Sequence, residues 1–164
     1  MLIGVISDTH GNYEGIKQAV AAAGTVDLWL HCGDFAADGE TLAALTDVPV
    51  LAVRGNCDMM TEAKEDEYID IGLTKIWVTH GHRYHPQTLA RELAVQALQK
   101  KVAVVCYGHT HMAYNCRHEG VLVFNPGSPV QPRGGGFPSC GILSVDEDGT
   151  VNGNIVRVAK ITKT

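Results

Sequence analysis

The sequence lacks paired cysteines. It has five of them, an odd number, and no Cys-x-x-Cys pair, which excludes a zinc ribbon, a thioredoxin-type redox pair and a secreted disulfide framework. Most of these cysteines are therefore expected to be small buried apolar residues in a reducing cytosol. This pattern predicts a cytoplasmic protein.

Positive charge and long apolar runs are also scarce. Lys and Arg number 13 against 18 Asp and Glu, which gives a formal net charge of −5, so a general nucleic-acid-binding surface is not expected. The N-terminus has no basic segment before its apolar run, and no apolar run is long enough to cross a bilayer. Neither a signal peptide nor a membrane partner is predicted.

The chain shows no linker, no low-complexity segment and no internal repeat. A length of 164 residues without a break in composition predicts a single domain over residues 1–164. No run of like charges marks a partner surface, and a homo-oligomer is compatible with this pattern.

What is present in the first half is an alternation of short apolar runs and helical patterns. Continuous apolar runs are typical of strands buried on both faces. The order βαβαβ predicts a parallel sheet with right-handed crossovers. The expected strands cover 2–7, 28–32 and 50–54, and the expected helices cover 13–23 and 40–45. Asn12 and Gly24 are expected to cap the first helix.

The second half is predicted to be mainly β. A hairpin is expected to turn at Gly72, and Pro86 is expected to open a helix whose apolar stripe ends at Leu98. The expected strands cover 68–71, 73–79, 102–107, 121–124, 142–145 and 155–158. Together these elements predict an α/β protein with a mixed sheet or two packed sheets flanked by helices.

Polar residues follow directly after five of the predicted strands. Ligands of open α/β sheets bind outside the carboxyl ends of the strands, where such residues would converge. Residues two apart in an extended chain point the same way, so Asp8 with His10, and His109 with His111, can each aim two side chains into one site. The five segments are Asp8-Thr9-His10, Gly33-Asp34, Gly55-Asn56-Cys57-Asp58, His80-Gly81-His82 and Gly108-His109-Thr110-His111.

The donor atoms in these segments are carboxylate oxygens, imidazole nitrogens and one amide oxygen. Such donors suit Mn²⁺, Fe²⁺, Co²⁺, Ni²⁺ or Zn²⁺. They are too many for one tetrahedral zinc and sufficient for two ions that share a carboxylate, an arrangement used in phosphate-ester hydrolysis. Each segment alone is common in turns, whereas their occurrence in order, each directly after a strand, indicates a binding site.

The five segments resemble the signature of the calcineurin-like metallophosphoesterases. Asn125-Pro126-Gly127-Ser128-Pro129, followed by Pro132-Arg133, is similar to the small prokaryotic phosphodiesterase branch of that family. The resemblance covers nearly the whole chain. It implies the metallo-dependent phosphatase fold, a four-layer α/β/β/α sandwich of two mixed β-sheets flanked by helices.

The resemblance also implies ligands for two divalent metal ions. Mn²⁺ is favoured, with Ni²⁺, Fe²⁺, Co²⁺ and Zn²⁺ as alternatives. A hydroxide that bridges the ions would attack the phosphorus of the substrate. Asp8, His10, Asp34 and His111 would hold one ion, and Asp34, Asn56, His80 and His109 would hold the other, with Asp34 as the bridge.

One position departs from the pattern of the wider family. Many members carry His directly after the metal-binding Asn, where this chain has Cys57. Because a thiol is a poor proton donor in place of an imidazolium, we consider Asn56, Asp58 and His82 as the catalytic residues. Asp58 could instead orient a metal ligand through a hydrogen bond, and His82 could instead contact the phosphate.

The segment 125–138 is rich in glycine and proline and holds two candidate substrate-binding residues, Ser128 and Arg133. A guanidinium suits phosphate through its planar fork, although the segment could also be a plain surface loop. His31 lies within an apolar strand and is expected to be structural, and His118 is expected to be exposed in a turn.

These observations predict a dinuclear metal-dependent phosphoric ester hydrolase with a small phosphate-ester substrate, and a phosphodiesterase is favoured. A phosphomonoesterase or a nucleotide pyrophosphatase with the same site is the alternative among enzymes. The alternative outside enzymes is a non-catalytic interaction scaffold, such as the retromer subunit of this fold. Degenerate metal ligands would favour a scaffold, and this chain has every expected ligand.

Overall fold

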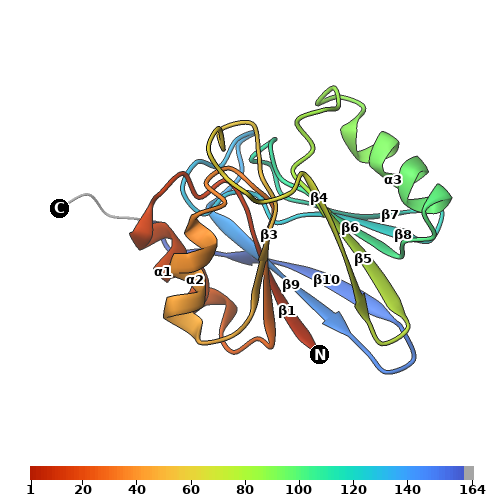
Figure 1. Cartoon of the computed structure of the whole chain (residues 1–164), viewed down its shortest axis with the longest axis horizontal. Helices are drawn as coiled ribbons and strands as arrows, with labels where there is room; N and C mark the ends of the chain where they lie inside the picture. The colour runs from red at the N-terminus through yellow and green to blue at the C-terminus, as the bar shows by residue number, and fades with distance from the viewer. Residues whose placement is uncertain (161–164) are drawn as a thin grey trace.

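A computed structural model describes residues 1–160 and shows ten strands and three helices among them (Figure 1). None of these helices has the length and apolar character that a membrane crossing requires. In chain order the elements are β1 (Leu2–Ile6), α1 (Tyr13–Ala23), β2 (Leu28–His31), α2 (Asp38–Thr46), β3 (Val50–Ala52), β4 (Asp66–Ile71), β5 (Thr74–Thr79), α3 (Leu89–Gln99), β6 (Val104–Cys106), β7 (Tyr114–His118), β8 (Val121–Asn125), β9 (Ser139–Val145) and β10 (Val151–Arg157).

The strands form two five-stranded mixed sheets. The first sheet has the order β10-β9-β1-β2-β3, and the second has the order β4-β5-β6-β8-β7. β1, β2 and β3 run parallel, as do β5, β6 and β8, and the remaining pairs are antiparallel. Helices α1 and α2 cover the outer face of the first sheet and α3 covers that of the second (Figure 1). The predicted four-layer sandwich is confirmed.

Alternation along each strand assigns its side chains to the layers. In β2, Leu28 and Leu30 pack between the two sheets, whereas Trp29 packs in the cluster under α1 and α2. In β5, Ile76 packs between the sheets and Trp77 packs under α3. Because both faces of these strands are buried at these positions, apolar residues follow one another there instead of alternating with polar ones.

Helix α1 has the predicted bounds because both of its ends are capped. Asn12 Oδ1 accepts a hydrogen bond from the N–H of Gly15 at 2.8 Å, and Gly24 ends the helix with a φ of 72°. Ile16 and Ala19 face the first sheet and are buried. Both predicted caps are confirmed.

Several other predicted boundaries are wrong for local reasons. Helix α3 begins at Leu89 rather than at Pro86, because the carbonyl of His85 accepts the N–H groups of Thr88 and Leu89 in a turn that precedes the helix. Elements α2, β9 and β10 begin earlier than predicted, at residues 38, 139 and 151.

Strand β7 is missing from the sequence prediction. It is largely polar and mostly exposed, so it shows no apolar run, and only its pairing with β8 at the sheet edge defines it. The prediction for His118 is wrong, because this residue ends β7, is half-buried and has its Nε2 atom 2.8 Å from the Tyr114 hydroxyl.

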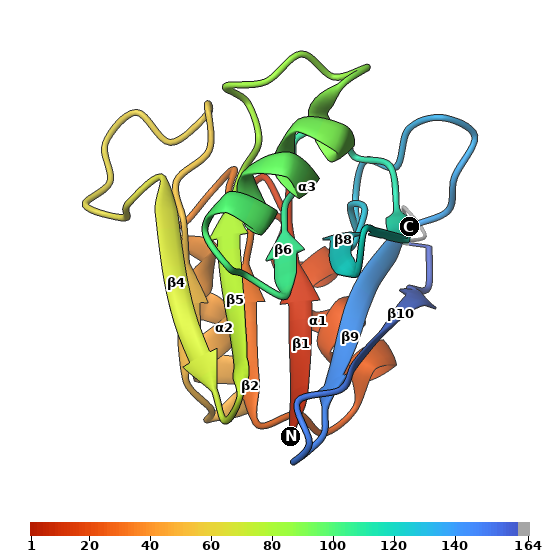
Figure 2. The same cartoon turned by 90° about the vertical axis from the view of Figure 1, so that its right-hand side faces the viewer.

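The parallel strands direct the polar loops to one edge of the molecule. β1 and β6 belong to different sheets, yet Figure 2 shows that their carboxyl ends point to the same side. The loops after them touch, since the N–H of His109 donates to Asp8 Oδ2 at 3.1 Å. The seam between the two sheets is therefore where the predicted donors can meet.

Candidate metal centre

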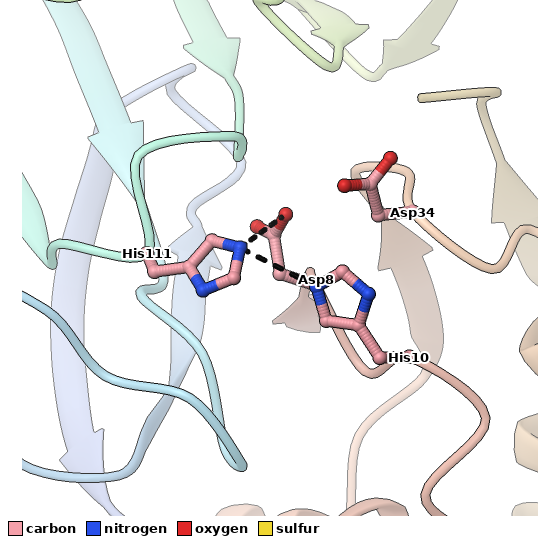
Figure 3. Close-up of side chains that lie close together, drawn as sticks. All are labelled: Asp8, His10, Asp34 and His111. Carbon is pink, nitrogen blue, oxygen red and sulfur yellow. Dashed lines mark hydrogen bonds and ion pairs between the residues drawn. The ribbon is translucent and has the colours of Figure 1, made fainter. Parts of the chain in front are cut away.

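Four of the predicted metal donors form one cluster at this edge (Figure 3). Asp8 and His10 follow β1, Asp34 follows β2 and His111 follows β6. Each side chain offers one ligand atom, and these atoms all lie within 4.8 Å of one another. A single divalent cation could therefore contact all four.

Two histidines direct lone pairs at the carboxylates. The Nδ1 atoms of His111 and His80 lie 2.8 Å and 2.6 Å from backbone carbonyl oxygens. A carbonyl only accepts hydrogen bonds, so both Nδ1 atoms carry a hydrogen and each neutral ring presents a lone pair at Nε2. These Nε2 atoms lie 3.3 Å from Asp8 Oδ1 and from Asp34 Oδ1, respectively. Two acceptors at this distance require a cation or a proton between them.

Burial makes this convergence costly without a cation. Asp8 is fully buried, and its Oδ1 has no hydrogen-bond partner in the described part of the chain. Burial disfavours the charged forms of Asp34 and His80, but their mutual attraction outweighs it. The pKa of Asp34 therefore lies well below its usual range and the pKa of His80 is raised. A metal ion would supply the positive charge in place of that proton, so the donors fit a divalent cation.

A second group of predicted donors surrounds Asn56. Its Oδ1 lies 3.1 Å from His80 Nε2 and 3.1 Å from His109 Nδ1, and its Nδ2 faces Cys57 Sγ at 3.6 Å. Burial, followed by the charge on the neighbouring His80, lowers the pKa of His109. Asp34 borders both groups through its contact with His80. The residues of the second predicted ligand set therefore also lie together.

The loops place these donors by adopting left-handed backbone conformations. Asp8, His10, Asp34, His109 and His111 have φ values between 49° and 66°, a region that residues other than glycine rarely occupy. Such conformations cost energy and persist only where the surrounding structure holds them, as is common at functional sites.

Two glycines allow the loops to approach the carboxylates. A Cβ atom at Gly55 would lie 2.1 Å from Asp34 Oδ1, and one at Gly108 would lie 2.7 Å from Asp8 Oδ2. No side chain can be placed so close, so the geometry of the cluster requires glycine at both positions.

Both carboxylate oxygens of Asp58 accept hydrogen bonds from backbone N–H groups. Its Oδ1 accepts the N–H of Ala36 at 2.8 Å and its Oδ2 accepts the N–H of Gly55 at 2.7 Å. The bond from Ala36 joins the loop after β3 to the loop that carries Asp34, and the bond from Gly55 closes a turn within the loop after β3. The contacts favour an orienting role for Asp58, the alternative to proton transfer that the sequence leaves open.

Ser128 is fully buried beneath the loop after β1. Its hydroxyl donates to the carbonyl of Asp8 at 2.9 Å and accepts the N–H groups of Val130 and Gln131 at 3.2 Å and 2.9 Å. With one hydrogen donated and two accepted, the hydroxyl has no capacity left for a substrate phosphate. In place of the predicted substrate contact, Ser128 holds the backbone of a candidate metal ligand.

His82 and Arg133 are the two remaining predicted site residues. The ring centroids of His82 and His80 lie 5.5 Å apart, and His82 Nδ1 is buried with no hydrogen-bond partner among residues 1–160. Arg133 is exposed, and its backbone N–H donates to the carbonyl of His111 at 3.0 Å. Both residues therefore lie beside the donors.

Cys57 occupies the position at which the sequence departs from the wider family. It is exposed, and its N–H donates to Asp34 Oδ1 at 3.0 Å. Desolvation, followed by the nearby Asp34 carboxylate, raises the pKa of its thiol to about 11. The thiol stays protonated near neutral pH and is too weak an acid to replace an imidazolium.

Asn125 is a site residue that sequence reasoning does not identify. It is fully buried, and its Nδ2 donates to the carbonyl of Gly108 at 2.9 Å. This bond fixes the loop that carries His109 and His111. Its place at the start of Asn-Pro-Gly-Ser is the signal that could have identified it.

The carbonyls that orient the two buried histidines are likewise not predicted from the sequence. Cys32 provides the carbonyl for His80, and Gln131 provides the one for His111. Because every residue has a backbone carbonyl, no sequence signal could have identified these two.

Known proteins resemble this chain over most of its length. Residues 1–148 match the family described as Calcineurin-like phosphoesterase superfamily domain. The chain is 34% identical over 145 residues to the probable metallophosphoesterase YsnB of Bacillus subtilis, with 88% of this chain and 84% of the relative covered. It is 32% identical over 168 residues to a phosphodiesterase of Methanocaldococcus jannaschii, with 90% of this chain and 95% of the relative covered.

A solved structure agrees with these matches. A conserved protein of Streptococcus pneumoniae, described as a predicted phosphoesterase, has a TM-score of 0.78 and 27% identity to this chain. The match covers 96% of this chain and 92% of the other.

Proposed function

The chain belongs to the calcineurin-like phosphoesterase superfamily, and from this membership and the donor cluster we propose that it is a dinuclear metal-dependent phosphodiesterase. Its relatives are named metallophosphoesterase and phosphodiesterase, and the chain is accordingly a metal-dependent phosphoric ester hydrolase. The observation that carries the proposal is the convergence of histidine lone pairs and buried carboxylates at one edge of the sheets.

Two ligand sets that share one carboxylate would hold the two ions. Mn²⁺ is the ion that the family resemblance favours, and Ni²⁺, Fe²⁺, Co²⁺ and Zn²⁺ are alternatives that the oxygen and imidazole donors suit as well. The first set is Asp8, His10, Asp34 and His111, and the second set is Asp34, Asn56, His80 and His109.

When bound, the ions would supply a nucleophilic water at neutral pH and stabilise charge on the phosphoryl oxygens. Asp8 and Asp34 contribute two negative charges against the four positive charges of two divalent ions. The centre therefore stays cationic and attracts a phosphate ester to a protein with a net charge of −5. Arg133, beside the first set, would bind phosphoryl oxygens through its guanidinium.

We assign proton transfer to His82 and an orienting role to Asp58. The Nδ1 of His82 has no hydrogen-bond partner among the described residues, and the ring of His82 lies 5.5 Å from that of His80, centroid to centroid. Both oxygens of Asp58 already accept backbone hydrogens. In this assignment His82 passes a proton to the leaving oxygen, and Asp58 keeps the loop of Asn56 against the loop of Asp34.

A phosphodiester is the favoured substrate for two reasons. A relative that aligns over 95% of its own length is named a phosphodiesterase. In addition, the second set lies at an exposed rim, because Asn56 and Cys57 are exposed, so a second ester group can extend into solvent.

The test is a comparison of two aryl esters with metal-stripped protein. Bis-p-nitrophenyl phosphate should be hydrolysed after addition of Mn²⁺ and faster than p-nitrophenyl phosphate, and chelation should abolish turnover. Faster turnover of the monoester would overturn the diesterase assignment. If the folded protein binds Mn²⁺ but hydrolyses neither ester with any divalent metal, the enzyme proposal fails and the scaffold alternative gains.

A further inference from the structure

A buried chain of three polar side chains lies behind the first ligand set. Thr9 and His31 are fully buried and Asp38 is 8% exposed. The Thr9 hydroxyl lies 2.9 Å from His31 Nε2 and 2.5 Å from Asp38 Oδ2. These three residues, here called the Thr9 network, contain none of the candidate metal ligands.

The hydrogen bonds of the Thr9 network run in one direction. The N–H of Gly33 donates to His31 Nδ1 at 3.2 Å, so the hydrogen of the neutral ring is on Nε2 and is donated to Thr9 Oγ1. The Thr9 hydroxyl then donates to Asp38 Oδ2, and the N–H of Gly11 donates to the same oxygen at 2.9 Å. Burial lowers the pKa of His31, which agrees with a neutral ring.

The backbone groups held by this network alternate with the candidate ligands. Thr9 lies between Asp8 and His10, Gly11 follows His10, and Gly33 precedes Asp34. Asp8, His10 and Asp34 all have left-handed backbone, at φ values of 55°, 49° and 57°. A left-handed conformation of such residues persists only where the surrounding structure enforces it, and the Thr9 network bonds to the positions between and beside them.

The network also joins two loops that come from different strands. Thr9 and Gly11 belong to the loop after β1, and Gly33 belongs to the loop after β2. Outside the network, the N–H of Asp8 and the hydroxyl of Ser7 make the same connection to the carbonyl of Gly33, at 3.0 Å and 3.5 Å. A buried polar network with every member bonded is rigid. It can therefore keep donors on both loops in place before a cation arrives.

We propose that Thr9, His31 and Asp38 are positioning residues that preorganise the first ligand set for its metal ion. The proposal rests on the proposed function only in that the first set binds a divalent ion. It makes no use of turnover. It changes the role of His31 from a general structural residue of the strand to part of the metal centre.

The decisive variants are a matched pair at Thr9. Thr9→Val keeps the shape of the side chain but removes the hydroxyl, whereas Thr9→Ser keeps the hydroxyl. Metal-stripped variants are titrated with Mn²⁺ by calorimetry, and their unfolding in urea without metal is measured in parallel. Changes in groups that orient metal ligands typically weaken metal binding by roughly 10- to 100-fold, and this loss is expected for Thr9→Val. Thr9→Ser should bind within about threefold of the wild type, because the chain of hydrogen bonds is kept.

A merely structural role predicts a different outcome. In that case Thr9→Val would unfold at lower urea concentration, but its folded fraction would bind Mn²⁺ as the wild type does, and the proposal would be overturned. If Thr9→Val does not fold, Asp38→Ala takes its place. This variant removes the acceptor of the Thr9 hydroxyl and of the Gly11 N–H, and a Mn²⁺ affinity equal to that of the wild type would again overturn the proposal.

Failure of this inference can be told apart from failure of the proposed function. If the wild type binds no Mn²⁺, Co²⁺ or Zn²⁺, the metal centre itself is refuted and the network with it. If the wild type binds metal without hydrolysing esters, only the enzymatic proposal fails. If the wild type binds metal and hydrolyses esters, and Thr9→Val binds Mn²⁺ as tightly as the wild type, only the positioning role of the Thr9 network is refuted.

Discussion

The two ligand sets differ in how deeply they lie and in how firmly they are held. In the first set Asp8 is fully buried, His111 is 3% exposed and His10 is half-buried. In the second set His80 is also fully buried, but His109 is half-buried and Asn56 is exposed. The first set is backed by the Thr9 network and by the hydroxyl of Ser128. By contrast, the side-chain N–H of Asn56 donates to the Sγ atom of the neighbouring Cys57 at 3.6 Å within the described chain.

This difference predicts unequal affinities. Donors that are fixed before binding lose little conformational entropy when the ion arrives, so a preorganised set binds more tightly. The first set should therefore fill at lower metal concentration than the second. The exposed second set would be the side at which the substrate reaches the centre.

The largest effect is expected from the residue that the two sets share. Asp34→Ala removes one negative charge and the carboxylate ligand that both sets share, so Mn²⁺ binding should weaken at both. The loss in kcat/KM on bis-p-nitrophenyl phosphate should exceed the roughly 100-fold that changes around metal ligands typically cause. Circular dichroism of the metal-free variant serves as the folding control. Activity within tenfold of the wild type would contradict a shared ligand.

The next variants separate the two sets. Asn56→Ala should lose the weaker ion and retain about one tightly bound Mn²⁺ per chain, whereas His111→Ala should lose the tight one. Metal analysis after gel filtration measures the stoichiometry, and bis-p-nitrophenyl phosphate hydrolysis should fall strongly in both. If Asn56→Ala lost the tightly bound ion instead, the prediction that the more buried first set binds its ion more tightly would be wrong.

A smaller effect is expected from the hydroxyl below Asp8. Ser128→Ala leaves the N–H groups of Val130 and Gln131 and the buried carbonyl of Asp8 without their partner. The free energy of unfolding of the metal-free protein should fall by about 1–3 kcal/mol, as measured by urea denaturation. A direct role in substrate binding would instead raise KM and leave stability unchanged.

The smallest effect is expected at the exposed rim. Cys57→Ala should keep kcat/KM within about threefold of the wild type, because the Cys57 thiol is too weak an acid to protonate the leaving group at neutral pH. The matched variant is His82→Ala, whose kcat should fall far more if His82 transfers the proton. A large loss from Cys57→Ala with a small one from His82→Ala would reverse this assignment.

Much of the fold could be predicted because its signals are local. Strands β1 and β2 are buried on both faces and are therefore continuously apolar, and α1 carries its caps at Asn12 and Gly24. Strand β7 could not be predicted, since its polar sequence acquires strand structure through pairing with β8. The start of α3 depends on a turn at His85 that competes with the helix-opening preference of Pro86.

The candidate donors could be predicted because each follows a strand end. What the sequence does not show is which residues support them. In the sequence, Thr9 and Ser128 cannot be distinguished from other hydroxyl residues of strand ends and loops. His31, which bonds to Thr9, is 22 residues away, and the Asp8 carbonyl, which accepts from Ser128, is 120 residues away. Such roles depend on tertiary contacts, so only the structure reveals them.

The most direct test of the dinuclear account is a crystal structure of the protein soaked with Mn²⁺ and phosphate, with anomalous scattering used to locate the ions. The account predicts two peaks on either side of the Asp34 carboxylate, one among the side chains of the first set and one among those of the second, with phosphate between them. A single peak, or ions bound away from Asp34, would contradict it.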